Sequence, residues 1–322
     1  MFGLIGAAPA AATVTGAIAD VHPPIGVQGD VAHAQGSVMF SYRYQRQDLS
    51  SLQIGTAIVT TPIQGFTVLP SAMHTNTNQF EVMWAPLDEF TFVLSLPYLD
   101  KQMTQTDVSG VVYDTTTAGF GDFTISVLYQ VFQSERNRVH LNIGLSLPSG
   151  SITESEVTPV NNTLERLPYM MQLGSGTVDL RPGVTYNGEW KGTYWGGQLS
   201  GVLHAGTNSQ NYRLGDSYDV TAWAGRRWTS WFGTAFRLDW QHWFDPDGAD
   251  PLMNPNESPA DNPTMQGGRR LDALFGVDFY FEGELLKGTR LSVEAGLPAY
   301  QDLSGPQLRT RWMLTAGLQY VF

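Results

Sequence analysis

Charged side chains at alternate positions of otherwise apolar segments are the residues of this chain with the clearest capacity for chemistry. On one face of a strand, such groups either line a water-filled pore, where both signs set a transverse field, or pair as a salt-bridged network in a buried polar interior. The sequence leaves these two roles equally open. The candidate lining residues are eight arginines and eight acids: Arg43, Arg181, Arg227, Arg237, Arg270, Arg290, Arg309 and Arg311, with Glu81, Asp122, Asp179, Asp219, Asp239, Asp272, Asp278 and Glu294.

A short acidic run is a weak candidate for a metal site. It resembles the start of a calcium-binding loop, in which carboxylates at alternate positions supply hard oxygen ligands. Asp245 and Asp247 fit that spacing, but Asp250 falls at position six instead of five, and position twelve is Asn256. A solvated acidic loop is therefore the favoured interpretation.

Histidine and cysteine patterns predict neither a metal nor a cofactor. The six histidines form no H-x-x-H or H-E-x-x-H arrangement, and the chain has no cysteine. Disulfides, thiolate metal sites and cysteine nucleophiles are thereby excluded. We expect no cofactor.

Composition excludes two further classes of protein. The net charge of −12 argues against nucleic acid as a partner, because phosphate backbones call for concentrated basic surface. Beyond the extreme N-terminus no run of about 18 apolar residues occurs, which excludes a helical membrane bundle. Only 15% of the residues are charged while 12% are aromatic, which favours an extended, β-rich protein of the cell surface.

The charged residues lie on segments of about ten residues in which apolar and polar side chains alternate, as expected for strands with one apolar face. In the last segment the even-numbered residues from Trp312 to Phe322 are apolar, and most residues between them are polar. Twelve such segments occur, at about 37–47, 76–85, 90–100, 120–132, 139–148, 176–189, 193–205, 216–228, 232–244, 269–281, 289–300 and 308–322.

The connections predict an antiparallel meander, since longer ones follow odd-numbered segments and short ones follow even-numbered segments. Tryptophans gather in two belts, with Trp84, Trp190, Trp195, Trp228 and Trp231 by the short turns and Trp240, Trp243 and Trp312 near the other strand ends. Such belts are typical of strands that cross a bilayer, where only a closed barrel pairs every backbone group. We therefore predict an all-β, membrane-spanning, up-and-down barrel of about 12 strands, with long extracellular loops and short periplasmic turns.

Two details of this prediction concern the polar face. After closure, Arg309 and Arg311 on the last strand and Arg43 on the first become neighbours, with Glu81 as their nearest counter-charge. A two-sheet sandwich is the alternative fold, in which the aromatic faces pack into a dry core and the charges are solvated outside.

The two ends of the chain predict export and assembly in a bacterial outer membrane. Residues 1–19 are small or apolar and end in Ala17-Ile18-Ala19, an A-x-A pattern typical of signal peptides, although no Lys or Arg precedes Arg43, as expected if the start is truncated. Residues 20–36 form an expected irregular periplasmic segment, and 37–322 the barrel. The final aromatic strand, with Leu318, Tyr320 and Phe322 on one face, resembles the signal read by the barrel assembly machinery.

Several short motifs occur together along the chain. They include Gly26-Val27-Gln28-Gly29-Asp30, Ser41-Tyr42-Arg43-Tyr44, Gly119-Phe120-Gly121-Asp122-Phe123, Leu145-Ser146-Leu147-Pro148-Ser149-Gly150-Ser151 and Leu173-Gly174-Ser175-Gly176-Thr177. In combination they resemble a known bacterial outer-membrane family, the "putative MetA-pathway of phenol degradation" family, whose members are called transporters. The similarity spans about residues 22–322 and implies an outer-membrane barrel that passes small organic molecules. Relatives can be rich in Met and His near the first strand, whereas this chain has Gln45–Ser50 there, which weakens a metal-handling role.

The sequence thus predicts a passive channel for small solutes, with aromatic or other hydrophobic compounds as the class the resemblance suggests. Expected partners are outer-membrane lipid and lipopolysaccharide, the barrel assembly machinery and a small-molecule solute. One alternative is a barrel with a closed lumen that serves as a structural or adhesive surface protein. A less favoured alternative is an outer-membrane hydrolase. No G-x-S-x-G elbow occurs, and Gly174-Ser175-Gly176 is better interpreted as a bend at the start of a strand. We therefore expect that the protein is not an enzyme.

Overall fold

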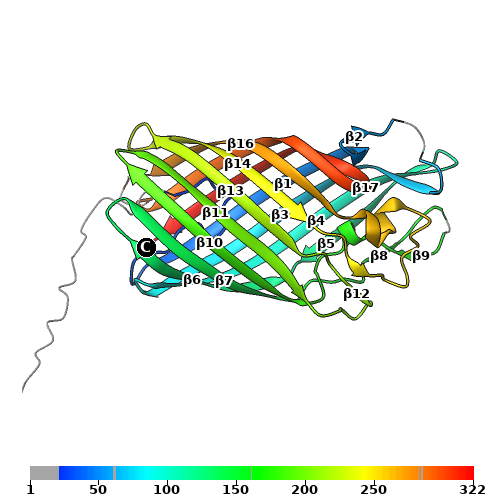
Figure 1. Ribbon diagram of the computed structural model, residues 1–322, viewed down its shortest axis with the longest axis horizontal. Helices are drawn as coiled ribbons and strands as arrows, with labels where there is room; N and C mark the ends of the chain where they lie inside the picture. Colours follow the sequence, from blue (N-terminus) through cyan, green and yellow to red (C-terminus); the bar gives the residue numbers. More distant parts are fainter. Residues whose placement is uncertain (1–21, 61–62, 161, 282, 284–285) are drawn as a thin grey trace, which may run out of the picture.

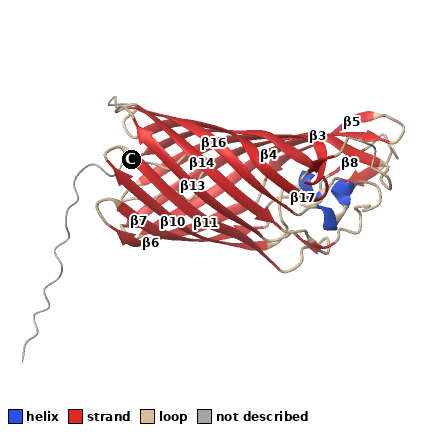
Figure 2. Cartoon of the chain, turned by 45° about the horizontal axis from the view of Figure 1, so that its top comes forward, coloured by secondary structure: helices blue, strands red, loops and turns tan. Residues whose placement is uncertain are grey.

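The chain folds into a closed antiparallel β-barrel, shown from the side in Figures 1 and 2. The computed structural model describes residues 22–322, apart from 61–62, 161, 282 and 284–285, so the predicted signal peptide lies outside the described residues. Neighbouring strands follow the chain order, and the last strand pairs with the first from Met39↔Val321 to Gly55↔Leu303. This pairing closes the sheet.

The barrel wall consists of long strands, and shorter elements lie in the connections. The wall strands are β1 (Val38–Gly55), β3 (Val68–Leu87), β4 (Phe90–Asp107), β6 (Phe123–Gln133), β7 (Asn137–Leu147), β10 (Val178–Trp190), β11 (Thr193–Ala205), β13 (Ser217–Arg227), β14 (Phe232–Trp243), β16 (Gly268–Phe281) and β17 (Thr289–Val321). The other elements are β2 (Ala57–Ile58), β5 (Val112–Phe120), β8 (Ser155–Val157), β9 (Leu164–Arg166), β12 (Tyr212–Arg213), β15 (Asp247–Gly248) and the 3-10 helices η1 (Tyr169–Met171), η2 (Pro259–Asp261) and η3 (Pro263–Met265).

No helix among the described residues is long and apolar enough to span a membrane.

The apolar face of each strand points outward. Phe236 and Phe275 lie side by side on β14 and β16 and are 49% and 56% exposed, whereas their inward neighbours Arg237 and Leu274 are buried. A sandwich would bury these rings between two sheets, so the alternative fold is wrong. The alternation read from the sequence is the alternation between lipid-facing and lumen-facing side chains.

The two ends of the barrel differ, and they define the names used below. At the short-turn end β10 and β11 are joined by Lys191 and Gly192, which have φ values of 49° and 74°. Positive φ at both central residues is typical of the type I′ turn that matches the twist of a two-residue hairpin. The long-loop end carries the 3-10 helices and the β8–β9 hairpin, opposite the C-terminus (Figure 1).

Most expected tryptophan positions agree with the two belts, but one does not. Trp84, Trp190 and Trp228 are exposed on the outer face at the short-turn end, and Trp312 is exposed nearer the other end. Trp243 instead points inward, lines a lumen cavity and donates its indole N–H to the Gln266 carbonyl at 2.7 Å. Odd-numbered residues of β14 face the lumen, and Trp243 follows that register.

Strand lengths also differ from the prediction at the long-loop end. β1, β3 and β4 continue well past the predicted segments, because residues expected as loops form an extended hairpin sheet with β5. The β4 extension, 101–107, is rich in Thr and Gln, and the β1 and β3 extensions mix apolar and polar residues without a regular period of two. The last two predicted segments form the single element β17, whose ends meet where the Val321 N–H donates to the Gly288 carbonyl at 3.1 Å. β17 therefore doubles back near Leu303, its first arm pairing with β16 and its second with β1.

We predict that Phe275→Arg destabilises the protein in phosphatidylcholine vesicles and lowers its free energy of unfolding by about 2–4 kcal/mol, because it places a charge in the middle of the outward apolar face. Thr234→Arg is the matched control, since Thr234 lies on the same outward face beside the belt residue Trp228. The Thr234 hydroxyl accepts a hydrogen bond from the Trp228 indole N–H. Its loss should be no more than about 1 kcal/mol. Equal losses of unfolding free energy for the two variants in a denaturant titration would contradict the placement of Phe275 at the middle of the membrane and of Thr234 near its edge.

Candidate functional site: the barrel lumen

The segment before β1 lies inside the barrel and is held there by its main chain. Barrel side chains donate hydrogen bonds to its carbonyls: Arg290 to Pro23 at 2.7 Å, Gln198 to Gln28 at 2.9 Å, His140 to Gly29 at 2.9 Å and Asn187 to Asp30 at 2.9 Å. Three of these donors come from the neighbouring strands β7, β10 and β11, and the fourth comes from β17. The segment 22–35, which the sequence predicts as irregular and periplasmic, is irregular and fills the lumen near the short-turn end; we call it the N-terminal plug.

The plug is packed as tightly as a protein core. Ile25 and Val27 are buried, and Val27 forms a cluster with the inward-facing Tyr194 and Trp223. A Cβ atom on Gly26 would overlap the Arg237 guanidinium and the Glu294 carboxylate, so any side chain there would displace this ion pair. The plug thus narrows the lumen to the space that its neighbours leave.

Most of the open space in the lumen lies between the plug and the long-loop end. A cavity of about 500 Å³ lies under the long loops, and it shares Lys101 with a cavity of about 410 Å³ and Gln241 with two of about 340 and 400 Å³. Gln28 of the plug lines the three deeper cavities. Towards the short-turn end, the space lined by Pro23, Ala32 and His140 holds only about 30 Å³. Between the plug and the long loops the lumen therefore holds four sizeable cavities with lining residues in common, and a much smaller cavity lies towards the short-turn end.

The long loop 148–177 folds into the opposite mouth of the barrel. The Asp122 carboxylate accepts hydrogen bonds from the backbone N–H groups of Gly150 and Ser175, each at 2.8 Å, and so joins the two ends of the loop. The Lys101 ammonium group donates hydrogen bonds to the carbonyls of Met170 and Gln172 at 2.9 and 2.5 Å. These contacts hold η1 inside the rim of the barrel; we call this loop the mouth loop.

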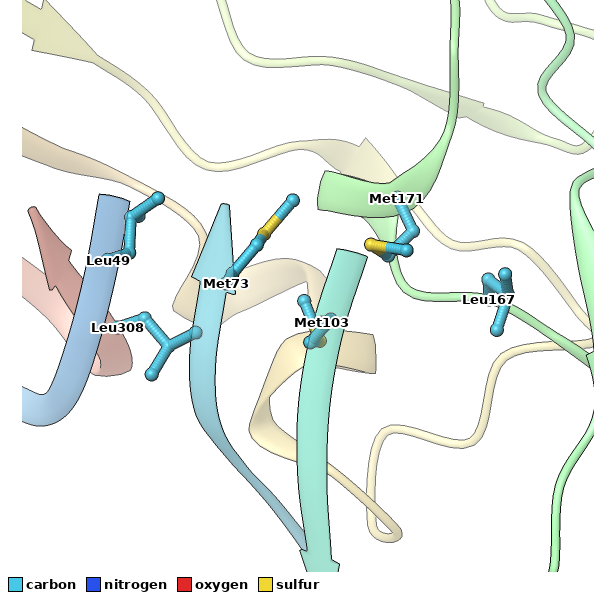
Figure 3. Close-up of a cluster of buried hydrophobic side chains, with 6 residues drawn as sticks. All are labelled: Leu49, Met73, Met103, Leu167, Met171 and Leu308. Carbon is cyan, nitrogen blue, oxygen red and sulfur yellow. The ribbon is translucent and has the colours of Figure 1, made fainter. Parts of the chain in front are cut away.

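An apolar cluster packs the mouth loop against the inner wall. Figure 3 shows Met171 and Leu167 of the loop facing side chains of four strands. The wall members of the cluster are Leu49, Met73, Met103 and Leu308. Apolar residues on the inner face also occur under the plug, where Ala32 packs with Met39 and Met83.

Eight of the sixteen predicted lining residues form close ion pairs inside the barrel. Four pairs lie at 2.7–3.1 Å and are buried: Arg43 with Glu81, Arg237 with Glu294, Arg270 with Asp272, and Arg290 with Asp278. Arg181, Asp122 and Asp179 line the 410 Å³ cavity, and Asp219 and Asp239 line the 340 Å³ cavity. The lining is thus both a paired network and a surface facing open space.

Three predicted lining arginines lie elsewhere. β-bulges in the pairing of β1 with β17 shift the alternation, so Arg311 is exposed and Arg309 lies between the inward-facing Leu308 and Thr310. Arg309 and Arg311 therefore do not join Arg43 on the inner face, as the sequence had predicted. Arg227 lies at the short turn after β13 and donates to the carbonyls of Thr229 and Ser230. Of the eight arginines and eight acids, five arginines and eight acids remain inside, which leaves this set three charges negative.

The acidic run does not gather into a site. Asp245 accepts hydrogen bonds from the backbone N–H groups of Gln266 and Gly267, Asp247 faces Arg213 at 3.8 Å, and Asp250 is buried against Arg166 at 3.1 Å. Each carboxylate has its own structural partner. No group of three acidic or histidine side chains in the described part of the chain is arranged to hold a metal ion.

The loop 249–267 carries a carboxyl group whose burial makes its docking sensitive to pH. Burial raises the pKa of Asp261 in η2 well above its ordinary value, and the neighbouring Glu257 and Glu165 raise it further. A pKa raised in the docked state means that docking is strongest below the ordinary carboxyl pKa and weakens as the pH rises through the raised value.

We therefore expect amide hydrogen exchange in residues 249–267, corrected for intrinsic rates, to lose protection as the pH rises, by up to about tenfold per pH unit in that window. Asp261→Asn should remove this dependence because its side chain stays neutral. Asp247→Asn, at a side chain that is 83% exposed, is the control and should behave as the unaltered protein does. The same pH dependence in all three proteins would contradict the assignment.

Comparison with known proteins agrees with the architecture. No family model and no curated protein matches the chain. The solved structure of the COG4313 outer membrane channel from Pseudomonas putida F1 is 12% identical and covers 90% of this chain and 97% of its own, with a TM-score of 0.65. The transport unit of the autotransporter AIDA-I from Escherichia coli is 11% identical over 91% of both chains, with a TM-score of 0.49. The KdgM porin is 9% identical over 88% of this chain and 99% of its own, with a TM-score of 0.42.

The first of these likenesses confirms the predicted outer-membrane β-barrel fold. The outward apolar face and the closed hydrogen-bonded wall are what that location requires, because lipid offers no partner to backbone groups.

Proposed function

We propose that the protein is a narrow passive channel for small solutes in the bacterial outer membrane, and that it belongs to the phenol-degradation transporter family that its motifs resemble. In this proposal the two arms of β17 are separate crossings, which makes twelve. The short-turn end then faces the periplasm and the long-loop end the cell exterior, as is usual for outer-membrane barrels. Lipopolysaccharide surrounds the outer rim, and the assembly machinery reads the final strand.

The cavities between the mouth loop and the plug are the observation that carries the proposal. They are lined by uncharged polar side chains and ion pairs, so they can hold water and dissolved solutes. The outermost cavity, of about 500 Å³, adds the apolar side chains of Leu49, Met73, Trp243 and Phe244. Methionine and aromatic side chains adapt to varied apolar ligands, which supports aromatic or other hydrophobic compounds as solutes.

A closed-lumen surface protein is the second candidate, and the tight packing of the plug favours it. The cavity of about 30 Å³ beside the plug has room for one or a few water molecules. The two candidates differ in whether solutes cross the folded protein.

We predict discrete conductance steps when the folded protein is inserted in a planar bilayer, and liposome swelling with small phenols that exceeds swelling with disaccharides. Silence in both assays, with the protein shown to be folded by its heat-dependent gel mobility, would favour the closed surface barrel.

Deleting residues 22–35 should raise the single-channel conductance several-fold, because the plug occupies the narrowest part of the lumen. The wall remains closed in this variant, since β1 begins at Val38 and pairs with β17. Val108→Ala, on an exposed turn far from the lumen, is the control and should leave the conductance unchanged. An unchanged conductance after the deletion would show that the plug does not set the constriction.

A further inference from the structure

The cavity of about 500 Å³ under the long loops differs in charge from the cavities below it. Its lining includes the basic side chains of Lys101, His204 and Arg270. No Asp or Glu is among the residues of the described chain that line it. Each of the three deeper cavities, by contrast, has at least one acidic residue in its lining. The outermost cavity is therefore the part of the lumen in which a negatively charged group meets the least repulsion.

Two of the three basic groups have acidic partners outside the cavity. Arg270 binds Asp272 through its Nε at 2.9 Å. The two ring nitrogens of His204 lie 3.7 Å from the carboxylates of Asp179 and Asp216. These carboxylates balance Arg270 and His204 without lining the cavity themselves.

The third basic group, Lys101, has no such partner. Its ammonium group is held by the carbonyls of Met170 and Gln172, and in the described part of the chain no carboxylate lies within ion-pair distance of it. An ammonium group has three donors, so one of them is unused. A charge that is withdrawn from bulk water and has no counter-ion is costly. Lys101 lines both the 500 Å³ and the 410 Å³ cavity, so a solute there can supply the missing anion.

Apolar side chains surround this charge. Leu99 and Met170 line both cavities together with Lys101, and Trp243 and Phe244 line the outer one. A mostly apolar wall with a few placed polar groups, around a volume of this size, is typical of sites for small organic molecules. The wall and the ammonium group together fit a molecule that has an apolar body and one negative charge.

We propose that the 500 Å³ cavity binds small carboxylates with an apolar body, which accept a hydrogen bond from the Lys101 ammonium group and lie against the apolar wall. A carboxylate supplies both the counter-charge and the acceptor that Lys101 lacks, and such charge-assisted hydrogen bonds are stronger than neutral ones. An alcohol of the same shape supplies the acceptor without the charge and therefore binds more weakly. This proposal names a solute class for the proposed channel and rests on that function for its role in transport, whereas the binding itself does not.

Calorimetric titration of the detergent-folded protein with benzoate tests the binding. Benzyl alcohol is the uncharged probe with the same ring, and acetate is the charged probe without a ring. We expect benzoate to bind at least about tenfold more tightly than either, since hydrogen bonds to charged groups contribute more than neutral ones. Lys101→Met keeps the length of the side chain and removes its charge, so it should lower the affinity for benzoate to that for benzyl alcohol. Lys101→Arg keeps the charge and should retain the binding.

Two variants control for other effects of the substitution. Lys191→Met makes the same change of charge on the exposed turn between β10 and β11 and should leave benzoate binding unchanged. Thr117→Val removes another hydrogen bond between the barrel and the mouth loop, to the Met171 carbonyl at 2.8 Å, without a change of charge. It should weaken benzoate binding far less than Lys101→Met does. Circular dichroism and heat-dependent gel mobility show that each variant is folded.

Equal affinities of the unaltered protein for benzoate and benzyl alcohol, or unchanged benzoate binding by Lys101→Met, would overturn the site. An equal loss in Thr117→Val would also overturn it, because the effect would then belong to the mouth loop. Planar-bilayer recordings in KCl separate the site from the channel. Benzoate binding by a protein without conductance supports the site and contradicts the channel, and conductance without benzoate binding does the reverse. If both hold, benzoate should interrupt the KCl current briefly, and Lys101→Met should remove these interruptions.

Discussion

Pairing of every backbone polar group within the wall is the constraint on which the rest of this structure depends. In hydrocarbon an unpaired N–H or C=O group has no water to bind, so a sheet can cross only if its last strand meets its first. The pairing of β1 with β17 meets this requirement. Closure fixes an outside and an inside, and the alternation of side chains then sends Phe275 to lipid and Asp272 to the lumen.

Closure also creates a polar interior that must be satisfied from within. The barrel does this with buried ion pairs, with a plug held through its carbonyls and with a mouth loop joined at both ends to Asp122. These devices fill much of the lumen and leave cavities between the loop and the plug. The charge of the lumen is the result of where the bulges fall, because they move Arg309 and Arg311 off the inner face while every predicted acid stays inside.

Alternation predicted the fold because it depends on local side-chain chemistry that a sequence displays directly. The strand limits at the short-turn end were predicted within a few residues for the same reason. The long extensions of β1, β3 and β4 were missed because strands that need not face lipid carry no regular apolar face. The inward Trp243 and outward Arg311 were misplaced because belt position and bulge position depend on register, which the residue types alone do not fix.

The plug was missed as part of the site because its contacts join residues far apart in the chain, such as Pro23 with Arg290. Its one local signal is the run Gly26-Val27-Gln28-Gly29-Asp30, in which Gly26 lies against the Arg237–Glu294 ion pair. The pairing of Asp239 with Asp272 is likewise a matter of register. Alternation in the sequence predicted which residues face the lumen, and only the three-dimensional arrangement shows which of them are in contact.

Accessibility of adjacent residues to lipid and to water tests the central claim most directly. The chain has no cysteine, so single spin labels can be attached at Val220→Cys, on the outward face, and at Thr221→Cys, on the inward face of the same strand. In vesicles, collision with lipid-soluble oxygen should dominate for the label at position 220, and the label at position 221 should be shielded from it. Equal oxygen accessibility at the two positions, or the reverse order, would contradict a barrel with its apolar face in lipid and its charges enclosed.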